Sequence, residues 1–187
     1  MLEPTKSTSD IFMSIKPEHM KNIASGAKNH EYRGYLLPSK VHRIWFYTTA
    51  PVKRLEYVAR ISAGKTPGKV PENGGIGNVD FNAGLKESKF GYEIIELWSL
   101  KNPISLQQAI STKILKGPPQ KYCWVPASLI RSLPLNTQHQ IISKRNEQVK
   151  NSTQETTLAE LFAKNKPAPA NEKREGNVLK AKEEEMG

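Results

Sequence analysis

The feature that most constrains how this chain can fold is a succession of short runs rich in β-branched and aromatic residues. Runs of this composition and length are typical of β-strands. We predict strands at 10–15, 30–37, 41–50, 55–63, 92–100 and 120–126. Because helical patterns separate only some of these runs, the chain has too many strands for a doubly wound sheet. We predict an α+β fold, a small β-barrel flanked by short helices.

Four stretches carry helical signals, and the first is the clearest. Pro17 suits the first turn of a helix, Glu18 complements the helix N-terminus, and Gly26 suits the exit. Met20 and Ile23 lie three apart on one apolar face, which indicates packing against the core rather than a cofactor site. The other predicted helices lie at 103–115, 127–133 and 136–150.

A glycine-rich segment interrupts the pattern between two predicted strands. Residues 64–90 contain six glycines and two prolines, and a loop of this length in a compact domain is usually functional or disordered. A triphosphate-binding loop needs the pattern GxxxxGK[ST] before a helix, and the segment has neither, so we reject this activity. Lys65 and Lys69 predict phosphate contacts from a mobile basic lid, with a plain solvated loop as the alternative.

The two ends of the chain differ from its middle in composition. We predict a flexible N-terminal arm at 1–9, a folded domain at 10–143, and an extension at 144–187 that starts helical and continues as a disordered, charged tail. Leu158 and Phe162 in the tail have helical spacing. A short helix that docks on a protein partner and transient helicity without a partner both remain open.

The basic charge of the chain is concentrated in the predicted domain. The net charge is +10, and residues 1–143 carry nineteen basic and ten acidic side chains, a net of +9. Excess positive charge favours polyanionic partners through phosphate contacts and the release of counterions. RNA or single-stranded nucleic acid is the predicted partner, and a surface charged only for solubility is the alternative.

Cysteine usage and the lack of long apolar runs indicate the compartment. Cys123 is the single cysteine, so neither an intrachain disulfide nor a cysteine-based zinc site forms, and its bulky neighbours predict a buried position. The four histidines are scattered, so we predict no metal site. No apolar run reaches the roughly 18 residues of a membrane span, and no signal peptide is evident. We expect an intracellular monomer, in the cytoplasm or the nucleus, that contacts no membrane.

The stretch SGAKNHEYRGY, residues 25–35, is unusually charged for a segment between two apolar runs. It contains the pattern GxKxxExR, in which Lys28, Glu31 and Arg33 follow the glycine. Glu31 and Arg33 are two apart on a predicted strand, so they point to one face, which Lys28 can reach from the preceding turn. Because burying unpaired charge is costly, this face is either exposed to solvent or the wall of a polar cleft.

The order of elements around this motif resembles the ASCH family of the PUA-like superfamily. The similarity joins a strand ending in SIKPEH, a short helix ending in glycine, and GxKxxExR. It is close over residues 11–34, and from there to Leu133 it rests only on the succession of strands. The resemblance implies a PUA-like β-barrel and a role centred on RNA or nucleotides. It also implies a ligand-binding cleft that contains Ser14, Lys16, Lys28, Glu31 and Arg33.

The resemblance favours binding over catalysis. Small hydrolytic members of the family use a lysine, a threonine and a later glutamate. Lys28 matches the lysine, but Glu31 stands in place of the threonine, and residues 102–116 contain no acidic side chain. We therefore predict a binding module that needs no cofactor. The alternative is a hydrolase of RNA or of a modified nucleoside, in which Lys28 and Glu31 form a proton-transfer pair.

Three consecutive aromatic residues lie on the predicted strand 41–50. Side chains alternate between the two faces of a strand, so at least one of the three belongs to the core, and we assign Phe46 to it. For Trp45 and Tyr47 the core and the cleft are both open, and we include them among the ligand-binding residues because exposed aromatic rings stack on bases. Two further tryptophans, Trp98 and Trp124, are predicted to lie in the core.

Overall fold

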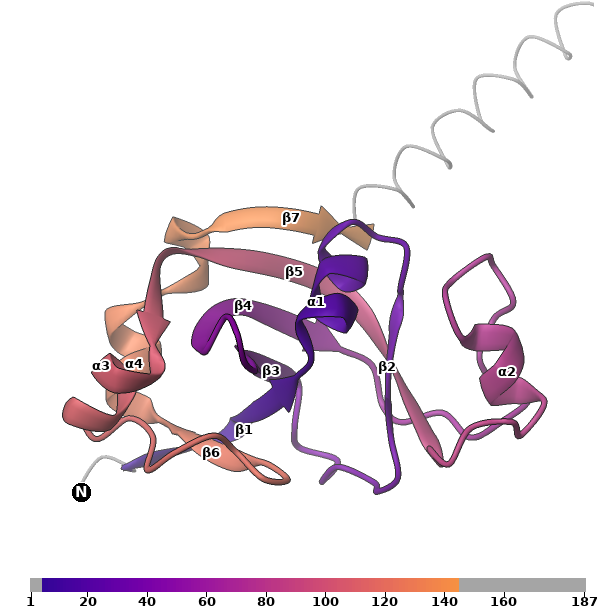
Figure 1. The fold of residues 1–187 in the computed structure, drawn as a ribbon, viewed down its shortest axis with the longest axis horizontal. Helices are drawn as coiled ribbons and strands as arrows, with labels where there is room; N and C mark the ends of the chain where they lie inside the picture. The colour runs from indigo at the N-terminus through magenta and orange to yellow at the C-terminus, as the bar shows by residue number, and fades with distance from the viewer. Residues whose placement is uncertain (1–4, 145–187) are drawn as a thin grey trace, which may run out of the picture. The chain divides into compact units, whose positions relative to one another are not determined.

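Strands dominate residues 5–144, the part of the chain that this computed structural model describes (Figure 1). The strands are β1 (Lys6–Ile15), β2 (His30–Arg33), β3 (Arg43–Thr48), β4 (Arg54–Ile61), β5 (Phe90–Ser105), β6 (Cys123–Pro126) and β7 (His139–Ser143). The helices are α1 (Pro17–Ala24), α2 (Asn78–Asn82), α3 (Leu106–Ser111) and α4 (Ala127–Ser132), and a 3-10 turn spans Leu135–Thr137. No helix among the described residues is long and apolar enough to cross a membrane.

The strands form one sheet that stays open. Its order is β2-β5-β4-β3-β1-β6, and β7 pairs with β5 on the edge away from β4. β1 and β3 are parallel, and the other pairings are antiparallel. Within the described residues β2 and β6 end the sheet without pairing with each other. The prediction of an α+β fold rich in strands is confirmed, but the prediction that the sheet closes into a barrel is wrong.

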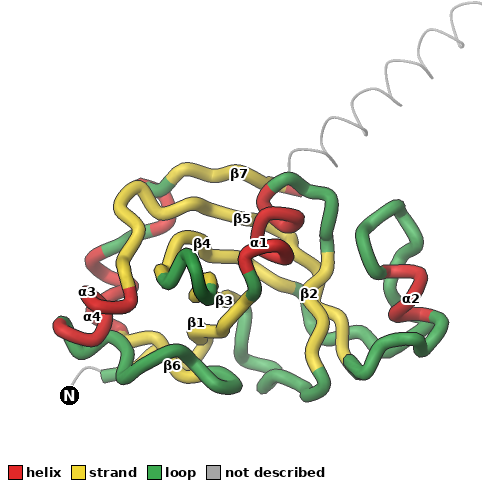
Figure 2. Tube along the Cα trace, in the orientation of Figure 1, coloured by secondary structure: helices red, strands yellow, loops and turns green. Residues whose placement is uncertain are grey.

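The sheet is open between its end strands β2 and β6. β6 pairs with β1, and α1 connects β1 to β2 beside this opening (Figure 2). β2 has only four residues and pairs with β5. A side chain rather than a backbone ladder joins β2 to β1, because Arg33 Nη2 donates a hydrogen bond to the Ser14 carbonyl oxygen at 2.7 Å. The charged motif therefore lies at the point where the barrel would have closed.

Two apolar cores lie on the two faces of β1 and β3. α1 covers the first core, and α3 and α4 cover the second. β3 contributes to both, since its side chains alternate between the faces. Ile44 and Phe46 belong to the first core, as predicted for Phe46, whereas Trp45 and Tyr47 belong to the second. Burial on both faces explains the continuous apolar runs at 11–13 in β1 and 44–47 in β3.

The two ends of the described chain differ from the sequence prediction. Residues 139–143 form β7, so the helix predicted at 136–150 is wrong over this part. The free edge of β5 at Glu96–Ser99 offers backbone partners, and this pairing overrides a weak local helical preference. At the other end β1 begins at Lys6, within the predicted flexible arm. The predicted extension, tail and docking helix fall at 145–187, outside the described residues.

The glycine-rich segment 64–90 contains α2, a helix that the sequence pattern did not predict (Figure 2). Asn78 at its start donates a hydrogen bond from Nδ2 to Asn29 Oδ1 at 3.1 Å, and it accepts one from the Tyr32 hydroxyl at 2.6 Å. The Tyr32 ring packs against Phe81 of α2, with ring centroids 4.6 Å apart. These contacts attach the segment to β2, beside the charged motif.

Three residues that were assigned to the core lie nearer the surface. Cys123 is exposed, so its predicted burial is wrong. Trp98 and Trp124 are half-buried, and Trp124 packs one side against the first core. The physical reason for Cys123 and Trp124 is their position on β6, which ends the sheet and has only β1 as a neighbour.

Candidate functional site

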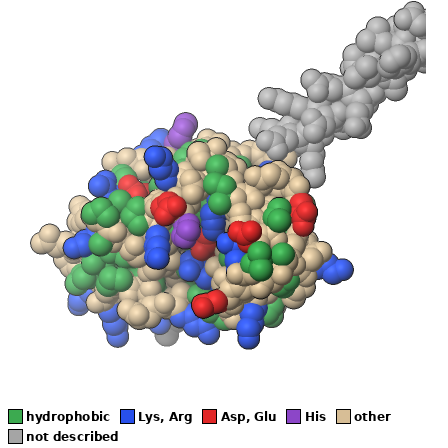
Figure 3. Space-filling view, turned by 45° about the vertical axis from the view of Figure 1, so that its right-hand side comes forward, with side chains coloured by type: hydrophobic (Ala, Val, Ile, Leu, Met, Phe, Trp, Pro, Cys, Tyr) green, Lys and Arg blue, Asp and Glu red, His purple; other side chains and the backbone are tan. Residues whose placement is uncertain are grey.

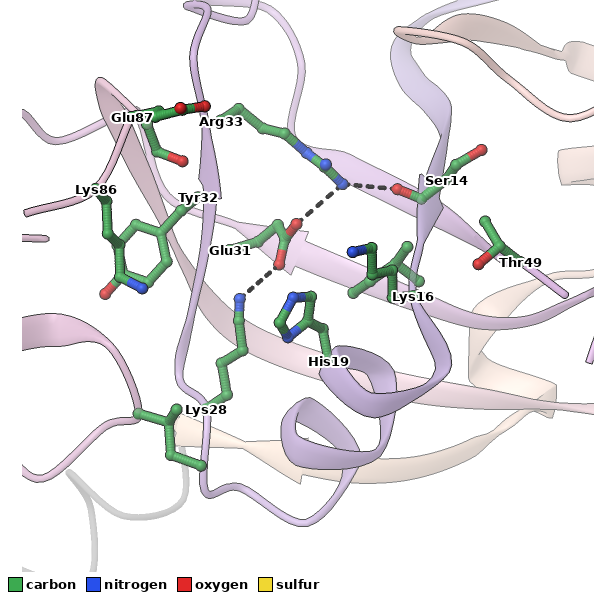
Figure 4. Close-up of a pocket in the computed structure, with 13 residues that line it drawn as sticks. Ser14, Lys16, His19, Lys28, Glu31, Tyr32, Arg33, Thr49, Lys86 and Glu87 are labelled. Carbon is green, nitrogen blue, oxygen red and sulfur yellow. Dashed lines mark hydrogen bonds and ion pairs between the residues drawn. The ribbon is translucent and has the colours of Figure 1, made fainter. Parts of the chain in front are cut away.

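A cavity of about 510 Å³ lies between the β1–α1 connection and β2 (Figure 4). Ser14, Lys16 and His19 come from one side, and the motif residues come from the other. The segment before β5 adds a third wall. The lining residues are Ser14, Ile15, Lys16, His19, Lys28, Glu31, Tyr32, Arg33, Thr49, Ile76, Lys86, Glu87 and Ser88. The space-filling view shows basic, acidic and histidine side chains gathered around a hollow in the middle of this face (Figure 3).

The turn between α1 and β2 brings the motif into the cavity. Gly26 ends α1 with a φ of 80°, a backbone conformation that glycine adopts without strain. The chain then turns so that the Lys28 amide donates to the Asn22 carbonyl oxygen at 2.9 Å. Side chains alternate between the two faces of β2, so Glu31 and Arg33 lie on the same side, as their spacing predicted.

Glu31 is the centre of the site. Its Oε2 lies 2.8 Å from Lys28 Nζ, and its Oε1 lies 2.9 Å from Arg33 Nη2. Lys28 is only 6% exposed and Glu31 only 3%. The interpretation of this stretch as a solvated face is therefore wrong, and the charges are paired with one another at the wall of a polar cavity. Pairing offsets part of the large cost of removing these charges from water.

Arg33 is held by one contact within β2 and two contacts with β1. Besides Glu31, its Nη2 donates to the Ser14 carbonyl oxygen, and its Nε lies 2.9 Å from Met13 Sδ. The Ser14 hydroxyl donates to the Pro119 carbonyl oxygen at 2.6 Å. Ser14 therefore positions the arginine through its backbone, while its hydroxyl proton is engaged with another loop.

The charge balance of the cavity is positive. Four lysine or arginine side chains and two glutamates line it, and they are Lys16, Lys28, Arg33, Lys86, Glu31 and Glu87. Glu31 is neutralised by its two partners, whereas Lys16 is exposed at the mouth of the cavity. A cavity with this balance attracts an anionic or strongly polarised ligand.

Tyr32 forms an aromatic part of the wall, although its position between Glu31 and Arg33 predicts that it points away. Lys28 Nζ and Lys86 Nζ lie 5.1 and 5.6 Å from its ring centroid, within the range of cation–π attraction. Burial raises the pKa of the Tyr32 phenol well above its usual value, with Glu31 and Asp80 adding to the effect. The ring is thus a neutral surface between charged groups.

A second polar cluster lies at His30, which is fully buried on β2. His30 Nδ1 lies 2.8 Å from Asn29 Oδ1, and Nε2 has no hydrogen-bond partner. Burial and the nearby Lys65 lower the pKa of His30 to about 4. Burial raises the pKa of Glu93, but hydrogen bonds from Lys144 and Lys65 outweigh it and bring this pKa down to about 2. At neutral pH the histidine is neutral and Glu93 is ionised.

The remaining predicted site residues lie elsewhere. Trp45 and Tyr47 are 1% and 2% exposed in the second core, so their predicted place in the cleft is wrong. Covering both faces of β3 leaves neither ring accessible. Lys65 Nζ lies 2.9 Å from Glu93 Oε2, so its charge already has a partner, whereas Lys69 is exposed. Phosphate contacts by these two lysines stay a prediction.

Several cavity residues were missed by sequence reasoning. They are His19, Tyr32, Thr49, Lys86 and Glu87. His19 lies one turn into α1 and within SIKPEH, which was a usable signal. The others come from distant segments that only the tertiary fold brings together. Among residues 5–144 no group of three histidine, cysteine, aspartate or glutamate side chains is arranged to hold a metal ion.

Comparison with solved structures places this fold beside ASCH domains. The ASCH protein of Zymomonas mobilis matches 73% of this chain and 100% of its own, with 23% identity and a TM-score of 0.53. Its serine-to-alanine mutant matches 68% of this chain and 95% of its own, with 24% identity and a TM-score of 0.51. Its tyrosine-to-phenylalanine mutant matches 70% and 99%, with 22% identity and a TM-score of 0.52. No family model and no curated protein matches the chain. The predicted resemblance is confirmed for the fold.

Proposed function

We propose that this chain, which has an ASCH-like fold, binds RNA or single-stranded nucleic acid and takes one nucleotide into the cavity around Glu31. The observation that carries the proposal is the buried arrangement of Lys28, Glu31 and Arg33 in a cavity that stays open. A volume of about 510 Å³ is within the usual range of small-molecule sites.

The order of charges suits the edge of a nucleobase. Base edges present hydrogen-bond donors and acceptors side by side. Glu31 offers acceptor oxygens, and Lys28 and Arg33 on either side offer donors. A base could direct an amino group at Glu31 and a carbonyl oxygen at Lys28 or Arg33, and each group would then form a hydrogen bond. Pre-positioning by Met13 and Ser14 reduces the entropy that Arg33 loses on binding.

Lysines at the mouth of the cavity suit the phosphates of the same ligand. Lys16 is exposed on the α1 side, and Lys86 lies on the opposite side, beside the Tyr32 ring. Phosphate contacts of this kind add affinity without sequence preference and weaken with salt. The net charge of +9 over residues 1–143 acts in the same direction over a longer range.

A salt-titrated binding assay tests this proposal. Fluorescently labelled single-stranded RNA, duplex RNA and single-stranded DNA are titrated with the full chain at several salt concentrations. We expect measurable affinity for a single strand at low salt and a linear loss of log affinity with log salt. The matched variants are Glu31→Gln in the cavity and Glu56→Gln, which alters a partly exposed carboxylate on β4 outside the cavity. If no nucleic acid binds even at low salt, the proposal is wrong.

A second candidate function is hydrolysis of a modified nucleoside or of RNA through Lys28 and Glu31. The observation in its favour is that Thr49 and Glu87 line the same cavity as Lys28, which supplies a hydroxyl and a second carboxylate. Incubation of wild type and Lys28→Ala with acylated cytidines and with RNA tests it. Turnover that disappears in Lys28→Ala supports hydrolysis, and the absence of turnover in wild type excludes these substrates.

A protein partner that binds the tail around Leu158 and Phe162 stays a prediction, since these residues lie outside the described part of the chain. Pull-down with the full chain and with a chain that ends at Lys150 tests it. We expect the truncated chain to keep its nucleic-acid affinity, because the cavity lies in the described residues.

A further inference from the structure

Three aromatic side chains form a continuous surface beside the cavity, which we call the aromatic platform: Tyr35, Tyr122 and Trp124. The ring centroids of Tyr35 and Tyr122 lie 6.2 Å apart, and those of Tyr122 and Trp124 lie 6.1 Å apart. All three are half-buried and pack against the first core on one side. Their other side is therefore available at the surface on a rigid support.

Exposed lysines cover the outer side of this platform. Lys121 Nζ lies 4.5 Å from the Tyr35 ring centroid and 6.0 Å from that of Tyr122. Lys40 Nζ lies 5.2 Å from the Trp124 ring centroid. Both lysines are exposed, so their flexible side chains can move aside for a ligand while keeping their charge close to it.

The platform begins at the edge of the cavity. Tyr35 follows Arg33 by two residues, and its hydroxyl donates to the Lys121 carbonyl oxygen at 2.9 Å. The loop before β6 is joined to the cavity a second time, because the Ser14 hydroxyl donates to the Pro119 carbonyl oxygen. A chain that leaves the cavity past Arg33 would meet Tyr35 first.

A second cavity, of about 480 Å³, lies at the far end of the platform. Trp124 lines it together with three exposed lysines, which are Lys6, Lys113 and Lys116. None of the three belongs to an ion pair found among the described residues. A Trp face beside free ammonium groups is suited to a base and its phosphates.

The segments that build the platform lack acidic residues. The sequence contains no Asp or Glu between Glu31 and Glu56, or between Glu96 and Glu147. The same stretches contain twelve lysine and arginine residues, whose charge no acidic residue within these stretches offsets. An apolar surface for a protein partner would not need this one-sided charge, whereas a polyanion is attracted by it.

We propose that the aromatic platform is a second binding region for single-stranded nucleic acid, on which bases stack while Lys40 and Lys121 contact phosphates. This proposal rests on the proposed function, because it extends the strand whose one nucleotide occupies the cavity. Stacking on aromatic rings requires unpaired bases and tolerates any sequence, so the platform selects single strands over duplexes. The lysines at Trp124 continue the path of the backbone.

Oligonucleotide length and paired variants test this. Single-stranded RNAs of one, two, four, eight and twelve nucleotides are titrated by fluorescence anisotropy or competition at fixed low salt. We expect affinity for the wild-type chain to rise with length beyond two nucleotides. Tyr122→Ala is expected to weaken the eight-nucleotide RNA about tenfold and to leave the mononucleotide unchanged. Tyr122→Phe keeps the ring and should bind like wild type.

The control is Tyr57→Ala, the same change at a half-buried tyrosine on β4, with the melting temperature of each variant measured in parallel. A loss in Tyr122→Ala that exceeds the loss in Tyr57→Ala and returns with Tyr122→Phe supports the platform. Equal losses in the two alanine variants, a duplex preference, or affinity independent of length overturns it. The cavity proposal is tested separately, by the binding of wild type and Glu31→Gln to a single strand.

Discussion

Two buried carboxylates of this molecule have similar exposure and opposite surroundings. Asp10 on β1 is 0% exposed and Glu31 on β2 is 3% exposed. Asp10 accepts hydrogen bonds from Arg43 Nε and Nη2, from Trp45 Nε1, and from two serine hydroxyls. Glu31 has only one charged donor at each oxygen and faces a cavity.

The difference lies in the acceptor capacity that remains. An ionised carboxylate has about four lone-pair positions. The five hydrogen bonds at Asp10 leave none for a ligand, and the residue lines neither the Glu31 cavity nor the cavity beside Trp124. Glu31 keeps about two positions free beside open space. Burial of a charge is therefore not a sign of function by itself, and incomplete hydrogen bonding next to a cavity is a better one.

Asp10→Ala should give the largest effect and should act on stability. The change leaves the partly exposed Arg43 guanidinium and the buried Trp45 indole N–H without their acceptor, and the loss of these hydrogen bonds costs about 3 kcal/mol. Urea unfolding followed by circular dichroism measures the loss. Asp10→Asn, which keeps one acceptor oxygen, should lose less. If Asp10→Ala is as stable as wild type, Asp10 is not a structural residue, and the contrast with Glu31 fails.

His30 adds an intermediate case, since it is buried like Asp10 and incompletely bonded like Glu31. Its pKa of about 4 in the fold lies below the usual 6.5, so the unfolded chain binds the proton more readily between these values. Stability is present above pH 6.5 and falls towards pH 4, by about 3 kcal/mol. The low pKa of Glu93 produces a further loss between pH 4.5 and about 2.

His30→Phe measures this contribution. We expect the unfolding free energy of the variant to be independent of pH between pH 6.5 and 4. Below pH 4 it should still fall with pH, as in wild type. Urea titrations at half-unit pH steps give both values. Glu93→Gln is the matched variant, and it should show the reverse pattern. If His30→Phe retains the wild-type slope above pH 4, His30 is not the group responsible.

Glu31→Gln should act on ligand binding more than on stability. The amide keeps the shape of the side chain but places an N–H group where one of the cations donates, so Lys28 and Arg33 lose their common orientation. We expect single-stranded RNA to bind about tenfold more weakly, which is about 1.4 kcal/mol. We expect the loss of stability to stay below that of Asp10→Ala, because the amide keeps one acceptor oxygen for Lys28 or Arg33.

Anisotropy titration and urea unfolding of the same Glu31→Gln preparation separate these two effects, and Glu56→Gln controls for the change in net charge. A variant that is strongly destabilised yet binds normally would place Glu31 with Asp10 as a structural residue. That result would remove the main argument for the cavity as a binding site.

Local features of the chain were predictable from its sequence. The proline, the apolar spacing and the glycine define α1, and two-residue spacing puts Glu31 and Arg33 on one face. These inferences hold because the interactions that decide them lie within a few residues. The spacing left open whether this face was solvated, and the resemblance to the ASCH family was needed to place Ser14 and Lys16 beside the motif residues.

Features that depend on distant packing were not predictable. Trp45 and Tyr47 are buried because α3 and α4 cover the second face of β3. The sequence around β3 does not indicate that these helices pack there. The sheet stays open, although the Arg33 side chain joins β2 to β1. β7 forms because β5 has a free edge, and the aromatic platform joins Tyr35 to Tyr122, which are far apart in the chain.

The smallest predicted effect concerns Lys86, at the mouth of the Glu31 cavity. If it contacts a phosphate, Lys86→Gln should weaken binding of all single strands by a similar factor. It should also reduce the slope of log affinity against log salt by about 1. Lys21→Gln on α1, outside the cavity, is the control for net charge. A slope that changes equally in both variants would show that the charge acts at long range rather than by contact. A slope that changes only in Lys86→Gln would show that the ligand backbone enters at the cavity mouth. This place lies next to Glu31, the carboxylate that, unlike Asp10, keeps acceptor positions free for a ligand.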